Sequence, residues 1–135
     1  MYGDGPVELV YAASFVSHIE LAWTLPEYEA FMERLATFCR VLVFDKAGVG
    51  LSDPVPQVRT LDDRATEIEA VMDAAGFGKA VVFGISEGGP AAIIFAATRP
   101  ERTRALILTG TFSFSGYAGW DDMDRAAGEP RTRAG

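Results

Sequence analysis

The sequence contains very little cysteine, histidine or positive charge. Cys39 and His18 are the only residues of their kinds among 135. A single cysteine excludes an internal disulfide and a cysteine-based metal cluster, and its apolar surroundings predict a packed thiol. The chain has 12 basic against 19 acidic residues and a formal charge of −7, with no basic cluster. This balance argues against a nucleic-acid or anionic-membrane partner.

Long apolar runs are also missing. No stretch approaches the roughly 20 residues that a membrane helix requires, and the N-terminus lacks the basic and then apolar pattern of a signal peptide. We therefore expect a cytoplasmic protein without a membrane partner, and the sequence indicates neither a cofactor nor a metal site. Apolar residues still make up 49% of the chain, which is enough for the core of one domain.

The chain does contain an alternation of strand-like and helix-like segments. Apolar runs predict strands over residues 7–13, 40–45, 79–83 and 103–109, separated by helices that begin near Pro26, Thr60 and Gly89. Thr60 and Asp63 can form a capping box, and this helix is expected to stop at Gly76. Residues 1–6, 14–25 and 46–59 are predicted as turns or loops. The apolar face of the helix after Pro26 is expected to consist of Tyr28, Phe31, Met32, Leu35 and Phe38.

This order predicts an α/β fold with a parallel sheet of about four strands and helices on both faces. Ligands of such sheets bind at the carboxyl ends of the strands. His18 and Ser86 come after predicted strands and Asp45 ends one, so we expect all three at that edge of the sheet.

The most informative segment is Gly84-Ile85-Ser86-Glu87-Gly88. It follows the strand over residues 79–83 and precedes a helical stretch, the arrangement of a nucleophile elbow. Both glycines are required, because a Cβ at either position of so tight a turn would clash with the neighbouring strand or helix. The helix N-terminus supplies N–H groups and a positive dipole to a developing oxyanion.

Five stretches of the chain resemble the α/β-hydrolase superfamily, and in particular the bacterial hydrolase domains fused to adenylate or guanylate cyclases. They are residues 15–23, 44–53, 71–76, 83–90 and 95–105. The resemblance covers residues 1–111 and indicates a partial domain, with residues 112–135 left as the stump of a lid or a disordered tail. It also implies that the four strands lie side by side in the order second, first, third, fourth.

The resemblance implies a role for each motif residue. Ser86 would be the nucleophile, and the backbone N–H groups of Glu87 and Phe15 would form the oxyanion hole. The remaining motif residues would shape the elbow and the loop beside the site: Gly84, Gly88, Asp45, Gly48, Gly50 and Ser52.

Three departures from the family pattern affect function. Ala13-Ser14 replaces the usual Pro-Gly or His-Gly before Phe15, and Lys46-Ala47 stands where the family carries an arginine. Most importantly, the acid and the histidine of the triad should follow the nucleophile in sequence, but the only histidine, His18, precedes Ser86. His18 is therefore the one histidine that could act as the general base, with Glu87 as an alternative base and Asp45 as a possible acid.

Three functions are compatible with this pattern. The first is a serine hydrolase that acts on small carboxylic esters and is inactive without its acid and histidine. The second is a non-catalytic sensor or interaction module, such as one beside a cyclase. The third is half of a split enzyme. The strands over residues 40–44 and 103–108 would be exposed edges, which predicts self-association.

Overall fold

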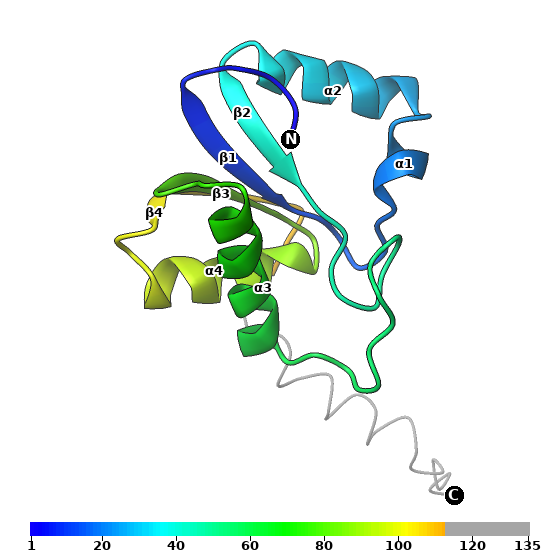
Figure 1. Cartoon of the computed structure of the whole chain (residues 1–135), viewed down its shortest axis with the longest axis vertical. Helices are drawn as coiled ribbons and strands as arrows, with labels where there is room; N and C mark the ends of the chain where they lie inside the picture. Colours follow the sequence, from blue (N-terminus) through cyan, green and yellow to red (C-terminus); the bar gives the residue numbers. More distant parts are fainter. Residues whose placement is uncertain (113–135) are drawn as a thin grey trace, which may run out of the picture.

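The computed structural model describes residues 1–112, in which four parallel strands form one sheet (Figure 1). The strands are β1 (Val7–Ala12), β2 (Cys39–Val43), β3 (Ala80–Ile85) and β4 (Thr103–Thr109). The helices are α1 (Ile19–Ala22), α2 (Pro26–Ala36), α3 (Leu61–Ala74) and α4 (Gly88–Thr98). Apart from Phe112, the lid stump or tail predicted for residues 112–135 lies outside the described residues.

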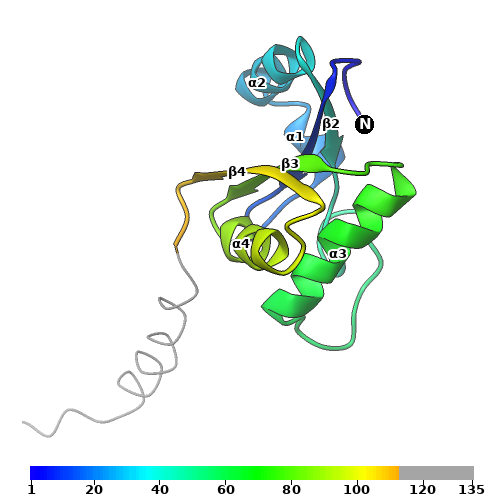
Figure 2. The same ribbon diagram turned by 90° about the vertical axis from the view of Figure 1, so that its left-hand side faces the viewer.

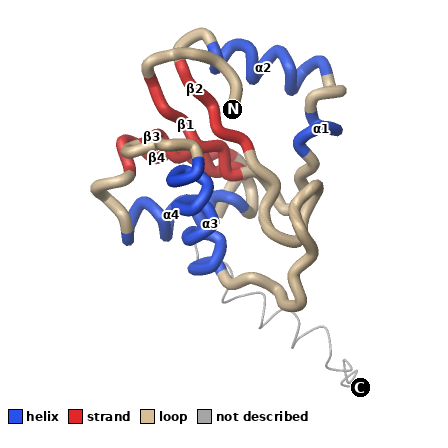
Figure 3. Tube along the Cα trace, in the orientation of Figure 1, coloured by secondary structure: helices blue, strands red, loops and turns tan. Residues whose placement is uncertain are grey.

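The strands lie in the order β2-β1-β3-β4, and every pair is parallel. In the register of the sheet, Val10 of β1 pairs with Leu42 of β2 and with Val82 of β3. This confirms the predicted sheet and its strand order. The carboxyl ends of β1, β2 and β3 therefore meet at one edge, where the loops after β1 and β2 run side by side (Figure 3).

The helices cover the two faces of the sheet unequally. Helix α2 lies on one face, and α3 and α4 lie on the other (Figure 2). Successive residues of β1 point to opposite faces, so Val10 packs among the side chains of α3 and α4, whereas Leu9 and Tyr11 pack with Met32 of α2. Because both faces are covered, the central strands are apolar almost throughout.

Helix α3 begins and ends as the sequence predicts. The Thr60 hydroxyl accepts a hydrogen bond from the Asp63 N–H at 3.1 Å, and the Asp63 carboxylate accepts one from the Thr60 N–H at 2.9 Å. These two bonds form the capping box. At the other end Gly76 has a φ of +70°, the left-handed conformation with which many helices stop.

The prediction for α2 is wrong in part. Met32 is buried, but Phe31 and Phe38 are exposed. Phe38 lies beyond the end of the helix, in a turn closed by its N–H on the Leu35 carbonyl at 3.1 Å. Phe31 contacts Phe83 of β3 with one side of its ring and leaves the rest of the ring uncovered.

The predicted loop over residues 14–25 contains the short helix α1. Four residues are too few for a helical period to be visible in the sequence. Instead, the helix is defined by its cap, in which the His18 imidazole accepts a hydrogen bond from the Leu21 N–H at 3.3 Å.

The two edges of the sheet differ from each other. Residues 1–6 do not form a simple turn, because Tyr2 pairs antiparallel with Val41 through two backbone hydrogen bonds of 2.9 and 2.8 Å. This segment covers part of β2, so the expectation of a bare edge is only partly right there. On β4, by contrast, Leu106, Ile107 and Leu108 are all exposed.

Among residues 1–112, no helix is long and apolar enough to cross a membrane.

We expect the 135-residue chain to self-associate through β4, since exposed apolar edge strands pair readily with other strands. Ile107 is 43% exposed, and Ile107→Lys should shift the chain toward monomer at micromolar concentration in sedimentation velocity experiments. Val58→Lys also replaces an exposed β-branched residue by lysine, but in a loop, and serves as the control. A wild-type chain that is fully monomeric would contradict this prediction.

Candidate active site

Ser86 occupies the turn between β3 and α4 in a conformation that few side chains adopt. Its φ of +50° is the only positive value of a non-glycine residue among residues 1–112. The turn is held at the backbone: the Ser86 N–H donates to the Thr109 carbonyl at 3.2 Å, and the Ser86 carbonyl accepts from the Gly89 N–H and from the Thr111 hydroxyl. Such strain persists only where surrounding contacts enforce it. In the described part of the chain, no hydrogen bond engages the Ser86 hydroxyl.

The two elbow glycines allow backbones to approach each other closely. A Cβ on Gly84 would lie 2.7 Å from the Cα of Gly89, and one on Gly88 would overlap the carbonyl groups of Ala12 and Ala13. The start of α4 therefore packs directly on the end of β1. This is the clash that the sequence pattern predicts.

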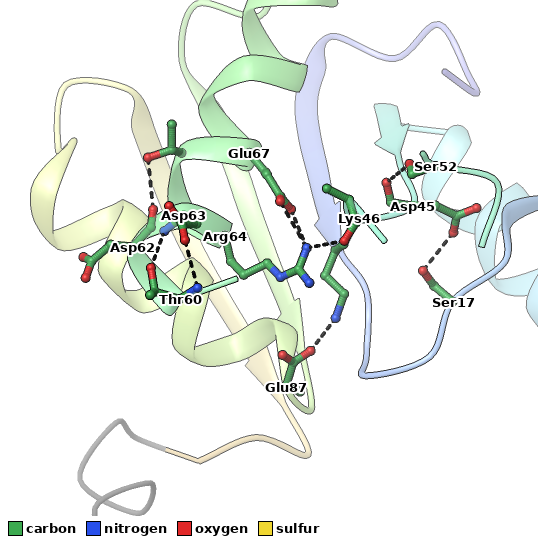
Figure 4. Close-up of polar contacts among 12 residues, drawn as sticks. Ser17, Asp45, Lys46, Ser52, Thr60, Asp62, Asp63, Arg64, Glu67 and Glu87 are labelled. Carbon is green, nitrogen blue, oxygen red and sulfur yellow. Dashed lines mark hydrogen bonds and ion pairs between the residues drawn. The ribbon is translucent and has the colours of Figure 1, made fainter. Parts of the chain in front are cut away.

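A buried lysine connects three loops at this edge. Lys46, which follows β2, is only 6% exposed. Its ammonium group donates to the Ser14 carbonyl at 2.8 Å and forms an ion pair with the Glu87 carboxylate (Figure 4). Ser14 and Glu87 are the neighbours of Phe15 and Ser86, so one side chain ties the predicted oxyanion loop to the elbow.

Asp45 organises the loop after β2. Its carboxylate accepts hydrogen bonds from the Ser17 hydroxyl at 2.8 Å and from the N–H groups of Ile19 and Leu51 at 3.1 and 3.0 Å. Burial acts to raise the pKa of Asp45, but these bonds and the nearby His18 outweigh it, so the pKa lies below its ordinary value. Asp45 therefore stays ionised, and its hydrogen bonds join the loop after β2 to the segment of Ser17 and Ile19.

The other motif residues of this loop serve Asp45 or the turn around it. The Ser52 hydroxyl donates to the Asp45 carbonyl at 2.6 Å. Gly50 has a φ of +58°, and a Cβ there would overlap the Asp45 carboxylate. Gly48, with a φ of +81°, closes the loop through its N–H on the Asp53 carbonyl at 2.9 Å.

The structure does not bring His18 to Ser86. One imidazole nitrogen, Nδ1, caps α1, and within residues 1–112 no hydrogen bond joins the ring to the Ser86 hydroxyl. Glu87 is engaged by Lys46. The His18 imidazole and the Glu87 carboxylate therefore both have partners other than Ser86.

Phe15 lies in the loop between β1 and α1 with its side chain exposed. In the described residues, neither its N–H nor that of Glu87 donates to another protein group. Neither backbone donor predicted for the oxyanion hole is therefore taken up by a protein acceptor within residues 1–112. Over the same residues, no group of three or more His, Cys, Asp or Glu side chains is gathered as a metal would need.

Comparison with known proteins matches the family model of the alpha/beta hydrolase fold to residues 21–130. The chain belongs to this family. Two curated relatives are hydrolases. The proline iminopeptidase of Neisseria gonorrhoeae is 37% identical over 75 residues, which cover 54% of this chain and 24% of the relative. The putative carbamate hydrolase RutD of Azorhizobium caulinodans is 33% identical over 102 residues, which cover 76% of this chain and 37% of the relative.

Solved α/β-hydrolase structures share the arrangement of the sheet. A hydrolase from Pseudomonas aeruginosa PA01 superposes with a TM-score of 0.71 at 25% identity, covering 95% of this chain and 48% of that one. A mutant of the meta-cleavage product hydrolase CumD superposes with a TM-score of 0.68 at 28% identity, covering 82% of this chain and 40% of that one. The chain spans at most about half the length of these proteins.

Sequence reasoning missed Lys46, which it treated only as the neighbour of a missing arginine. A signal for it was present: a lysine directly after one predicted strand and a glutamate directly after Ser86 carry opposite charges at the same sheet edge. The structure turns this coincidence into a buried ion pair.

Gly88→Ala should destabilise the chain by about 3 kcal/mol or more, because the new Cβ would force the elbow away from the Ala12 and Ala13 carbonyls. Gly78→Ala is the matched control, since a Cβ there meets nothing within 4 Å, and it should change stability by less than about 1 kcal/mol. Urea unfolding measures both effects, and equal effects would contradict the close packing.

Glu87→Gln should cost about 1–3 kcal/mol of stability, because it leaves the buried Lys46 charge without its counter-ion. Glu8→Gln removes the acid of the more exposed pair with Arg40 and should cost less than about 1 kcal/mol. The comparison is made by urea unfolding at neutral pH. If Glu87→Gln is as mild as Glu8→Gln, Lys46 does not depend on the carboxylate.

Proposed function

We propose that the 135-residue chain is the part of a serine hydrolase that carries the nucleophile, and that this hydrolase acts on small carboxylic esters. Ser86 attacks the carbonyl carbon, and the N–H groups of Glu87 and Phe15 stabilise the oxyanion that develops. The observation that carries this proposal is the elbow itself: a serine with a φ of +50° between a strand and a helix, whose hydroxyl has no hydrogen-bond partner within residues 1–112.

The reaction class follows from chemistry shared with the relatives. Iminopeptidase and carbamate hydrolase are names for enzymes that transfer an acyl or carbamoyl group to water. An oxyanion hole and a serine serve any such reaction, because each passes through a tetrahedral intermediate. We assign esters to this chain because an alkoxide or phenolate leaves more readily than an amine, which must first be protonated.

The proposal places the general base outside the 135 residues. His18 is the only histidine of the sequence, and its Nδ1 atom caps α1. Without a base, a serine hydroxyl is a weak nucleophile near neutral pH. The base and its orienting acid would come from further residues of the same protein or from a second chain, which is the split-enzyme alternative.

A non-catalytic sensor or interaction module is the second candidate. It is favoured by the engagement of both His18 and Glu87 with groups other than Ser86. In this case the hydrolase scaffold would bind a ligand without turning it over, whether or not a cyclase is attached.

The 135-residue chain should hydrolyse p-nitrophenyl acetate at close to the background rate, since the triad and general-base catalysis contribute several orders of magnitude. Ser86→Ala and His18→Ala should therefore leave the rate unchanged. Release of p-nitrophenolate is followed by its absorbance. Fast hydrolysis that both substitutions abolish would identify His18 as the base.

A second readout separates the hydrolase from the binding module. During long incubation with the same ester, the Ser86 hydroxyl should slowly displace p-nitrophenolate from the carbonyl carbon and lose its proton to water. The acetyl group should then persist, because deacylation also needs a base. Peptide mapping by mass spectrometry should find acetyl on Ser86 in preference to Ser14 and Ser17, and not in Ser86→Ala. Absence of this preference would favour the binding module.

A further inference from the structure

A cavity of about 310 Å³ opens between the end of β1, helix α1 and the start of α2. Tyr11, His18, Ala22, Tyr28 and Asp45 are among the residues that line it, and Ser86 is not. Its wall includes Ser14, whose carbonyl accepts the hydrogen bond from Lys46, but Lys46 itself does not line the cavity. The ester hydrolysis proposed above gives this cavity no role.

Two tyrosines that line the cavity make no hydrogen bond through their hydroxyl groups within residues 1–112. Tyr11 is only 8% exposed, and its ring stands edge-on to that of Tyr28, with 6.5 Å between the ring centroids. Within residues 1–112, neither hydroxyl makes a hydrogen bond, yet no polar side-chain atom sealed from solvent lacks a partner there. Both hydroxyls are therefore open to solvent, and both tyrosines line the cavity, where polar groups without a protein partner can bond to a ligand or water.

The phenols act as donors and not as anions. Burial, together with the nearby Tyr11 and Asp45, raises the pKa of Tyr28 to about 12, and burial raises the pKa of Tyr11 as well. Each hydroxyl keeps its proton at physiological pH and can donate a hydrogen bond to an acceptor that enters the cavity.

The remaining walls set the charge and polarity of an occupant. They are mainly apolar, and include Val16, Leu21, Leu25, Val43 and Phe44. The charged group at the wall is Asp45, whose carboxylate already accepts three hydrogen bonds and stays ionised. An anionic ligand would be repelled by this carboxylate.

We propose that this cavity binds an uncharged, mainly apolar small molecule with one hydrogen-bond acceptor, such as an aryl ketone, whose oxygen faces the hydroxyls of Tyr11 and Tyr28. The site does not rest on the proposed catalysis, because it includes neither Ser86 nor the donors of the oxyanion hole. An occupant would press on the loop of residues 14–18, which Lys46 ties to the elbow.

The test uses two probes of matched shape, 2-acetylnaphthalene and 2-naphthoate, added to the full 135-residue chain. Amide chemical shifts in the ¹H–¹⁵N spectrum report binding and its location. We expect 2-acetylnaphthalene to shift the amides of Val16, Ile19 and Ala22 and to bind at least about tenfold more tightly than the anion. Absence of binding, or equal binding of the two probes, would overturn the proposal.

Substitutions locate the site. Tyr11→Phe and Tyr28→Phe should each weaken binding of the ketone by about three- to tenfold, the effect of one lost hydrogen bond, whereas Tyr2→Phe, outside the cavity, should not. Ala22→Leu should block the cavity, and Ala30→Leu, on the exposed side of α2, is its control. Equal weakening by Tyr11→Phe and Tyr2→Phe, or none by Ala22→Leu, would contradict the assignment.

Ser86→Ala distinguishes this site from the proposed active site. Ketone binding should be unchanged in this variant, and a large loss would show that the probe binds at the elbow and not in the cavity. Conversely, a chain that binds the ketone but is never acetylated at Ser86 would favour the binding module over the proposed hydrolase and leave the cavity proposal intact.

Discussion

The close contact between the elbow and the end of β1 is the constraint on which the rest of the site depends. Gly88 lies against the carbonyl groups of Ala12 and Ala13 with no side chain between them. This contact brings the end of β1, and with it the start of the loop that follows, to the N-terminus of α4. The backbone of the elbow therefore has little room to move. The Ser86 N–H donates to the Thr109 carbonyl of β4 and the Ser86 carbonyl accepts from the Thr111 hydroxyl, and these bonds hold Ser86 in its strained conformation.

A second consequence of this contact is the burial of a positive charge. Lys46 reaches into the space beside the elbow, where its ammonium group needs partners because a desolvated charge is costly. The Ser14 carbonyl and the Glu87 carboxylate supply them. Because Lys46 engages the Glu87 carboxylate, this carboxylate is not free to act on Ser86.

Local features of the sequence predicted the scaffold well, and long-range contacts limited the rest. The four strands, the elbow glycines and the capping box of Thr60 and Asp63 depend on residues close together in the sequence, and all were predicted correctly. The pairing of Tyr2 with Val41 and the ion pair of Lys46 with Glu87 join residues far apart in the sequence, which no local pattern encodes. Phe31 was misassigned for a related reason: its spacing is right for a buried face, but the sheet covers only one side of its ring.

The position of His18 shows how a residue can lie at the right edge of the sheet without serving the chemistry found there. Its Nδ1 atom caps α1, and the residue lines the cavity beside Tyr11 and Tyr28. Each contact draws the imidazole away from Ser86. A general base must approach the elbow from elsewhere, on the side where the Ser86 hydroxyl has no partner among residues 1–112. The end of β1 and the loop after it thus belong to two different surroundings: the Ser14 carbonyl contacts the buried Lys46 beside the elbow, whereas Tyr11 lines a mainly apolar cavity together with Tyr28.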